Sequence, residues 1–303
     1  MSALDNPDLF ALEAAKSRMG EFAWPTVILG VTVTGAYVAT PFLVASSLLP
    51  VWLAVPLMIS LAYASYTVLH EAVHGSINGS HKSLRWLNEL MGYMAAFVLG
   101  IPMTAHRQEH LAHHRHTNDA QADPDHVVAE MTKSLPAAVK AALDVIRAQF
   151  FYYINHRWDN APRGQNVRFC LEIVVAIALR VLIIMLTTAP ISLLLFLAAG
   201  VGGIMLTMYL FAYLVHVPHE SVGRYVDTST VLVRGPLAKL VTWLWLFQNY
   251  HSIHHLFPRV PFYRYAAVFD EIRPVMEARQ APIYELGLGG MRPVEPCHST
   301  VPA

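Results

Sequence analysis

Histidines are concentrated between residues 106 and 126 of the 303-residue chain. Three of them, His110, His113 and His114, fall on one face of a predicted helix, because residues three and four apart are neighbours on a helix surface. Imidazoles clustered in this way suit a transition metal. A patch that binds nucleic acid would use Arg and Lys instead, and the formal net charge is +0. The spacing therefore predicts a metal site and no nucleic-acid partner.

Two further histidine clusters flank this stretch, one at residues 70–74 and one at residues 251–255. The three clusters read HxxxH, HxxHH and HxxHH, and their eight imidazoles are enough for two metal ions. The eight candidate ligands are His70, His74, His110, His113, His114, His251, His254 and His255.

Other metal chemistries compete for the first cluster. His-Glu-Ala-Val-His at residues 70–74 matches HExxH, in which two histidines bind zinc and the glutamate is the general base of a protease. A zinc protease needs only one further ligand, however, and this chain offers far more histidine than one zinc can use. Glu71 and His74 also fit the Glu-x-x-His pair of carboxylate-bridged di-iron bundles, but no second such pair accompanies them. A membrane zinc metalloprotease therefore stays a remote alternative.

The elements that must position these clusters are membrane helices. Only 14% of the residues are charged, against roughly a quarter in soluble domains, and the mean hydropathy is +0.40. Several apolar runs approach the ~20 residues that a membrane-crossing helix needs. The sequence predicts an all-α integral membrane protein with four spans below a helical cap. The spans are expected at about residues 24–49, 51–69, 169–188 and 190–215.

The flanking segments complete the predicted domain organisation. A single domain of residues 24–275 follows a surface segment, 1–23, in which Asn6 caps a short amphipathic helix with Leu9 and Phe10 on its apolar stripe. Residues 276–303 are rich in Pro and Gly and are expected to form a poorly ordered tail.

Basic residues predict the orientation of the spans. Twenty of the 21 Lys and Arg residues lie before the first span, between the second and third, or after the fourth. The positive-inside rule places those segments in the cytoplasm. Both termini and all three histidine clusters then share the cytoplasmic side, which a common site requires.

Some polar residues interrupt the apolar segments. Arg180, in the middle of the third span, would be costly if it faced lipid, so it is a candidate functional residue; snorkelling or a partner on another helix are the alternatives. Glu172 is two turns away, too far for a simple ion pair. Residues 84–103 carry Gly100 and Pro102 and are predicted to form a re-entrant or membrane-surface helix. Residues 135–153 read as an amphipathic helix.

The three clusters, the segments 117–119 and 123–125 after the second, and Asn-Tyr-His-Ser-Ile-His-His-Leu-Phe-Pro at 249–258 resemble the membrane fatty-acid desaturase and hydroxylase superfamily. The resemblance covers about residues 24–275. Asp-Pro-Asp-His after the second cluster, the segment 209–219 and the Gln-Asn-Tyr-His that opens the third cluster look most similar to β-carotene ring hydroxylases.

The resemblance implies two iron ions, O2 as co-substrate and the eight histidines above as ligands. A ninth family histidine follows the fourth span, and His216 matches it best, with His219 as the alternative. Where acyl desaturases carry an Asn four residues earlier, this chain has Ala212, which argues against a water-mediated Asn ligand. Metal-bound imidazoles usually donate their other N–H to a carboxylate or carbonyl. Residues expected to support the ligands in this way are His106, Glu71, Glu109, Asp119, Asp123 and His219, the alternative for each carboxylate being a helix cap or a surface charge.

The resemblance also implies an apolar substrate and an external source of electrons. The chain has no haem, flavin, nicotinamide or iron–sulfur motif, so a ferredoxin-like or cytochrome b5-like donor is expected to dock on the cytoplasmic face. Hydroxylation of a β-carotene ring at C3 is the leading hypothesis, and desaturation of an acyl lipid is the alternative.

Overall fold

Four helices of the computed structural model, which describes residues 6–294, are long and apolar enough to cross a membrane. They are α2 (Trp24–Ala45), α3 (Val51–His74), α7 (Arg163–Leu186) and α8 (Ala189–Thr207), which continues as a π-helical turn, η4 (Met208–Tyr213). The four predicted spans are therefore present as helices. Several bounds differ from the predicted ones. α2 ends four residues earlier than predicted, at Ala45. Helical hydrogen bonding continues past the apolar run in two places: α3 extends through the first histidine cluster to His74, and α7 begins six residues earlier than predicted, at Arg163.

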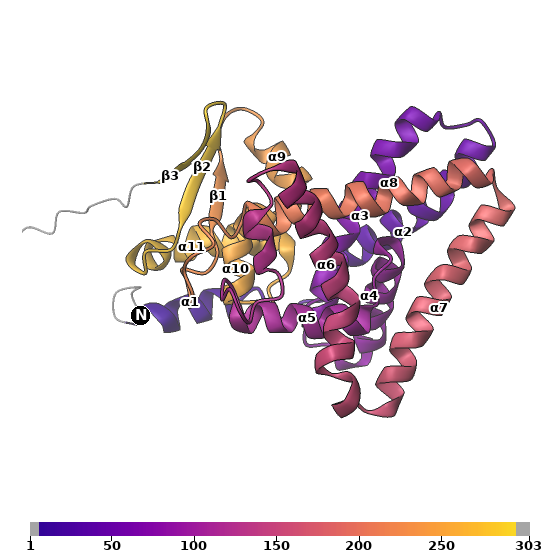
Figure 1. Ribbon diagram of the computed structural model, residues 1–303. Helices are drawn as coiled ribbons and strands as arrows, with labels where there is room; N and C mark the ends of the chain where they lie inside the picture. Colours follow the sequence, from indigo (N-terminus) through magenta and orange to yellow (C-terminus); the bar gives the residue numbers. More distant parts are fainter. Residues whose placement is uncertain (1–5, 295–303) are drawn as a thin grey trace, which may run out of the picture.

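The spanning helices do not pack equally. α3 lies at the centre, against α2, α4 and α8 (Figure 1). α3 and α8 approach closely at small residues, since a Cβ added to Gly203 would lie only 2.5 Å from Cβ of Ala62. α7 stands at the side of the bundle, and 11% of its apolar window is buried, against 44% for α3.

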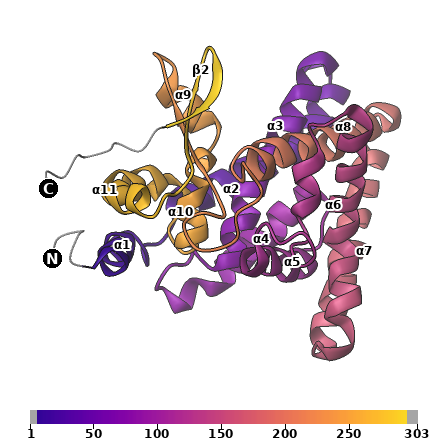
Figure 2. The same cartoon turned by 60° about the vertical axis from the view of Figure 1, so that its left-hand side comes forward.

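Further helices lie between the second and third spans along the chain, and α4 packs against α3 (Figure 2). They are η1 (Lys82–Leu84), α4 (Arg85–Leu99), α5 (Met103–His116), η2 (His126–Glu130), α6 (Leu135–His156) and η3 (Trp158–Asn160). The predicted helix at 84–103 is α4, which ends at Gly100 in the left-handed conformation. The predicted helix at 135–153 is α6.

The C-terminal part departs from the prediction of an all-α fold and a disordered tail. Its helices are α9 (Ala238–Leu244), η5 (Gln248–Tyr250), α10 (His251–Leu256), η6 (Phe262–Arg264) and α11 (Tyr265–Ala278). Its strands are β1 (Thr230–Val233), β2 (Ile283–Gly287) and β3 (Gly290–Pro293). β1 pairs in parallel with β2, with Thr230 opposite Ile283, and β2 pairs antiparallel with β3. The tail prediction is wrong up to residue 294, because β1 supplies backbone partners from fifty residues away. Residues 295–303 lie outside the described chain.

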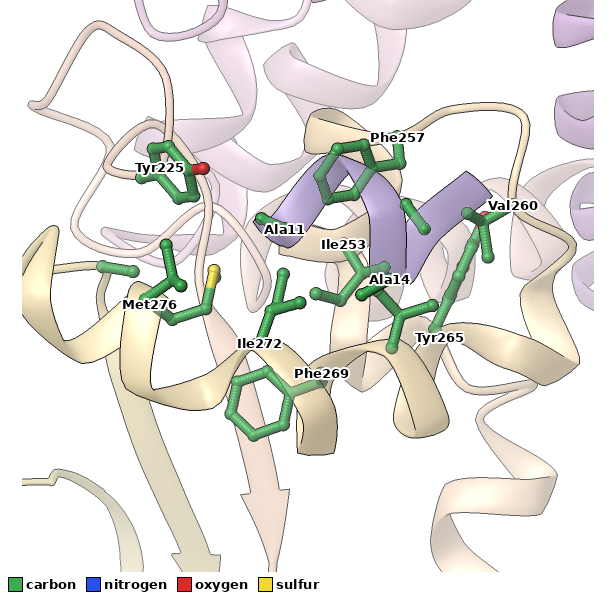
Figure 3. Close-up of a cluster of buried hydrophobic side chains, with 14 of the residues drawn as sticks. Ala11, Ala14, Tyr225, Ile253, Phe257, Val260, Tyr265, Phe269, Ile272 and Met276 are labelled. Atoms are coloured by element: carbon green, nitrogen blue, oxygen red, sulfur yellow. The ribbon is translucent and has the colours of Figure 1, made fainter. Parts of the chain in front are cut away.

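The sheet and a compact core hold the third histidine cluster. Asn249 donates to the carbonyl of Val231 at 2.9 Å, which ties the start of α10 to β1. On the other side, Ile253 packs against α11 and against α1 (Pro7–Lys16) (Figure 3). Asn6 caps α1 as predicted, by accepting from the Leu9 amide at 3.1 Å. The fully buried residues of α1 are Ala11, Ala14 and Ala15. Of the predicted apolar stripe, Phe10 is partly buried against the same core, whereas Leu9 is exposed.

Candidate metal centre

The nine candidate ligands come from three helices and one loop. His70 and His74 end α3, the second cluster lies on α5, the third lies on α10, and His216 follows η4. Nitrogens within 4.8 Å of one another form two groups. The first group comprises His70, His74, His110, His114 and His254, and the second group comprises His113, His216 and His255.

His251 lies between the two groups. Its ring centroid is 5.2 Å from that of His254 in the first group and 5.1 Å from that of His216 in the second. Its Nδ1 is 3.4 Å from Oε1 of Gln248. The fold thus brings all nine predicted histidines together.

Ring nitrogens in the first group make short contacts with one another that cannot all be hydrogen bonds. Nε2 of His110 lies 3.0 Å from Nε2 of His74 and 3.1 Å from Nε2 of His114, which in turn lies 2.9 Å from Nε2 of His254. An imidazole nitrogen presents either one hydrogen or one lone pair in the ring plane. Because two of these nitrogens each contact two others, the three contacts cannot all be hydrogen bonds. A cation that takes all four lone pairs satisfies them, so the donor set fits a metal.

The number of these imidazoles also bears on the kind of metal. The first group brings five imidazoles together. A catalytic zinc site takes three protein ligands and a structural zinc site takes four. The donor set is therefore larger than one tetrahedral zinc can use.

Burial keeps most of these imidazoles neutral. Burial, followed by the charges of neighbouring histidines, holds the pKa values of His110, His114 and His254 well below their usual range. The pKa values of His251 and His255 are lowered by the same causes. Neutral imidazoles present the lone pair that a metal needs. Several buried nitrogens have no hydrogen-bond partner within the described chain: both of His70, Nε2 of His216 and Nε2 of His255.

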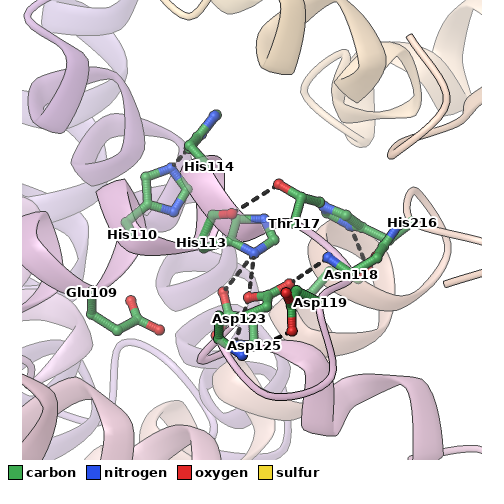
Figure 4. A network of polar contacts seen from close by, with 12 residues as sticks. Glu109, His110, His113, His114, Thr117, Asn118, Asp119, Asp123, Asp125 and His216 are labelled. Carbon is green, nitrogen blue, oxygen red and sulfur yellow. Dashed lines mark hydrogen bonds and ion pairs between the residues drawn. The ribbon is translucent and has the colours of Figure 1, made fainter. Parts of the chain in front are cut away.

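Asp123, one of the residues expected to support the ligands, contacts His113 of the second group (Figure 4). Nδ1 of His113 lies 2.9 Å from its carboxylate, which also accepts the backbone N–H of Asn118 at 2.8 Å. This contact fixes the tautomer and leaves Nε2 of His113 free. Burial lowers the pKa of His113, but Asp123, Asp125 and Glu109 outweigh burial and raise it to about 9. The same carboxylates would stabilise a cation bound at Nε2 in place of the proton.

His216 and His219, the two candidates for the ninth position, have different surroundings. Nδ1 of His216 donates to the carbonyl of Ala212 at 2.7 Å, which leaves Nε2 facing the second group. A backbone carbonyl therefore orients this ring, four residues back, where the chain lacks the Asn side chain. His219 belongs to neither group, and its ring lies beside that of Tyr213, with 5.0 Å between centroids.

Two of the carboxylates expected to support the ligands, Glu71 and Asp119, form hydrogen bonds elsewhere. Glu71 accepts from the hydroxyl of Thr26 and the backbone N–H of Phe262, so it joins α3 to α2 and to the start of η6. Asp119 is half-buried and accepts from the amides of Gln121 and Ala122, which makes it a turn cap. The expectation that these two orient a ligand histidine is wrong, because both find backbone or hydroxyl donors nearer by.

His106 and Glu109 lie behind the ligand face of α5. Nδ1 of His106 lies 2.7 Å from Oε1 of Gln149 on α6, and its ring stacks on that of His110 at 5.4 Å. Glu109 is fully buried, 3.6 Å from Nδ1 of His106, and burial raises its pKa. Burial and the charge of Glu109 raise the pKa of Asp125 well above its usual range. These residues form a buried polar layer next to the histidines.

Sequence reasoning missed several contacts to the candidate ligands. Nδ1 of His254 lies 3.1 Å from the hydroxyl of Tyr265, and Gln149 and Gln248 contact His106 and His251. Gln248 stands three residues before His251, a helical spacing that would have identified it. Nothing in the local sequence points to Tyr265 or Gln149.

An apolar cavity of about 310 Å³ lies next to the first group, separated from His70 by the rings of Tyr66 and Phe211. Tyr66 and Phe211 form its inner end, and the centroid of the Phe211 ring is 4.8 Å from that of His70. Leu197 and Val201 on α8 line the outer part and are more than half exposed on the apolar surface of the helix. An apolar chain can therefore approach the first group from the lipid-facing side of α8.

Comparison with known proteins agrees with this architecture. A fatty acid conjugase of Calendula officinalis is 23% identical over 68% of this chain and 63% of its own length. The sn-1 oleoyl-lipid 12-desaturase of a Picosynechococcus strain is 30% identical over 43% of this chain and 36% of its own length. A chloroplastic omega-3 fatty acid desaturase of Sesamum indicum is 24% identical over 72% and 54%.

This chain thus spans a little under two thirds of the length of the Calendula conjugase. The predicted superfamily is confirmed, while the β-carotene ring hydroxylase subgroup stays a prediction. The family match extends over residues 46–287 and includes all nine histidines, so the chain belongs to the fatty acid desaturase family.

Proposed function

We propose that the protein is a membrane-bound di-iron oxidoreductase that uses O2 and external electrons to oxidise a C–H bond of a lipid. The observation that carries the proposal is the pair of buried histidine groups beside the apolar cavity, whose lining residues Tyr66 and Phe211 contact His70. When bound, two irons supply the activation of O2 and the removal of hydrogen from an unactivated carbon.

The residues of the chain hold the ligands and exclude water. We assign the nine histidines as ligands of two irons: His70, His74, His110, His113, His114, His216, His251, His254 and His255. Asp123 and the carbonyl of Ala212 orient His113 and His216. Tyr66 and Phe211 stand between the cavity and His70, where they keep the approach to the site apolar.

An acyl chain of a membrane lipid is the first candidate substrate. The relatives in the comparison carry the names of acyl-chain desaturases and conjugases, and the cavity is lined mainly by aliphatic and aromatic residues. A β-carotene ring oxidised at C3 is the second candidate. It is favoured by the segment 209–219, by Gln248–His251 and by Ala212 in the place of the acyl desaturases' Asn.

Electrons would arrive from a ferredoxin-like or cytochrome b5-like protein on the face that carries the histidine groups, which the basic residues place in the cytoplasm with both termini. Arg107 pairs with Glu89 at 2.8 Å and Arg264 pairs with Glu21 at 2.9 Å. Arg115 is exposed at the end of α5, close to the ligand histidines, and is the arginine best placed to meet a donor.

Metal analysis and product analysis test the proposal. The purified chain should contain about two irons, and a single zinc with no iron would overturn it. The chain should then be expressed, with a compatible reductase system, in cells that accumulate β-carotene. New double bonds in acyl lipids support the first substrate, and hydroxylated pigment supports the second. If an iron-loaded chain changes neither lipid class, the proposed oxidation is contradicted; His254→Ala is the inactive control.

A further inference from the structure

Two charged residues of α7, Glu172 and Arg180, contact the short break between α4 and α5. α4 ends at Gly100 in the left-handed conformation with φ +76°, and α5 starts at Met103 after Pro102. The interruption leaves carbonyls free at the end of α4 and amides free at the start of α5. No side chain of α4 or α5 caps either end in the described structure.

Glu172 caps the start of α5. Its Oε2 accepts the backbone N–H of Thr104 at 2.9 Å, and its Oε1 accepts the hydroxyl of the same residue. A carboxylate at a helix N-terminus meets both the free amides and the positive end of the helix dipole. Glu172 contacts Thr104 and none of the candidate ligand histidines. Its effect on the site is therefore exerted through the position of α5.

Arg180 caps the end of α4. Its guanidinium donates to the carbonyls of Phe97 and Val98, and its other terminal nitrogen donates to Ala176 at 3.1 Å. The guanidinium also lies over the Phe97 ring, 4.9 Å from its centroid. A cation at a helix C-terminus meets the negative end of the dipole, which offsets the cost of placing an arginine in a span. This explains why Arg180 needs no carboxylate partner.

The two residues act on opposite helix ends and not on each other. They are eight residues apart on α7, about 12 Å along the axis at 1.5 Å per residue. The contacts are also among the few polar attachments of a helix that is mostly unburied. We propose that Glu172 and Arg180 are positioning residues that clamp the α4–α5 interruption.

The clamped segment touches both parts of the site. Leu99, Gly100 and Ile101 line the apolar cavity, and α5 begins two residues later. Thr104 is six residues before His110, about 9 Å along the helix. The clamp therefore sets the distance between the cavity wall and the second histidine cluster. If the protein has the proposed function, this distance determines which carbon of the substrate faces the irons.

Hydrogen exchange tests the clamp without any assay of activity. In the full-length protein in detergent or nanodiscs, Glu172→Ala should speed amide exchange at residues 103–106 about tenfold or more. Glu172→Gln should have a smaller effect, because its amide oxygen still accepts one bond. Arg163→Gln, at an exposed residue at the start of α7, is the matched control. Unchanged exchange in Glu172→Ala would overturn the clamp even if the protein oxidises no lipid.

A charge swap separates the clamp from a direct ion pair. Exchanging the two residues, as Glu172→Arg with Arg180→Glu, would restore a pair that attracted each other directly. If the two residues instead cap separate helix ends, the swap places the wrong charge at both ends. Amide exchange around residues 99–106 should then be faster than in either single neutral variant. A swap that exchanges like the wild type would refute the proposal.

The position of the oxidised carbon in the product distinguishes a positioning role from a purely structural one, because a purely structural residue would not change it. In Glu172→Gln and Arg180→Lys, iron should stay near two per chain while the distribution of oxidised carbons shifts by at least one position in a measurable fraction of product. An unaltered distribution at normal iron content would contradict the effect on the cavity. The proposed function fails separately, when the wild-type chain itself yields no product.

Discussion

The two histidine groups are built differently. The first group consists of histidines at the ends or on the faces of packed helices, α3, α5 and α10, and four of its five members contact one another directly through ring nitrogens. In the second group, ring nitrogens donate to oxygens outside the group: Nδ1 of His113 donates to the Asp123 carboxylate and Nδ1 of His216 to the Ala212 carbonyl. Helix packing therefore sets the geometry of the first group, and local polar contacts set that of the second.

The largest effect is expected from removing a shared member of the first group. His254→Ala should remove iron and lower turnover by more than about 100-fold, since loss of an outer partner alone costs 10–100-fold in affinity or activity. His254 is buried, and its Nε2 meets His114 at 2.9 Å. Iron per chain and product formation should be measured beside His116→Ala. His116 is exposed at the end of α5, which carries the second cluster, and belongs to neither group.

Retained iron and turnover in His254→Ala would show that His254 is not a ligand. Loss of both metals in that variant, and not of one, would show that the two groups assemble together, which would weaken the distinction drawn between them.

Asp123→Asn should affect the second group alone. The amide removes the negative charge opposite His113, and metal affinity should fall about 10–100-fold at that group. The first group does not contact Asp123, so iron should fall from about two per chain toward one. Metal content at increasing chelator concentration measures this. Equal loss from both groups would contradict the independence of the second group.

Helix packing around the first group is tested by a small-to-large change. In Gly203→Val the new side chain meets Ala62 of α3, whose Cβ would lie 2.5 Å from the added Cβ. Overpacking of this kind costs about 1–3 kcal/mol, so the melting temperature should fall. Gly200→Val is the matched control on α8, because nothing lies within 4 Å of its added Cβ. Equal melting temperatures in the two variants would contradict the close approach of α3 and α8.

The same distinction explains what could be predicted from the sequence. The four spans and the histidine clusters are local patterns, and Asp123 follows the second cluster closely enough to be identified as its partner. The sheet could not be predicted, because β1 and β2 are short and pair across fifty residues. Tyr265 reaches His254 only because α11 folds back over α10. Contacts within one element are visible in sequence, whereas contacts between elements depend on the packing.

The smallest effect is expected at His219, and it sharpens the description of the second group. His219 and His216 are three residues apart, so sequence spacing alone cannot choose between them. His219 lies beside Tyr213 outside the group, while Nε2 of His216 faces it. His219→Ala should therefore keep about two irons and nearly wild-type turnover, and His216→Ala should lose the metal of the second group. If the two variants exchange these outcomes, the ring oriented by the Ala212 carbonyl is not the ligand, and a segment after η4 must rearrange when metal binds.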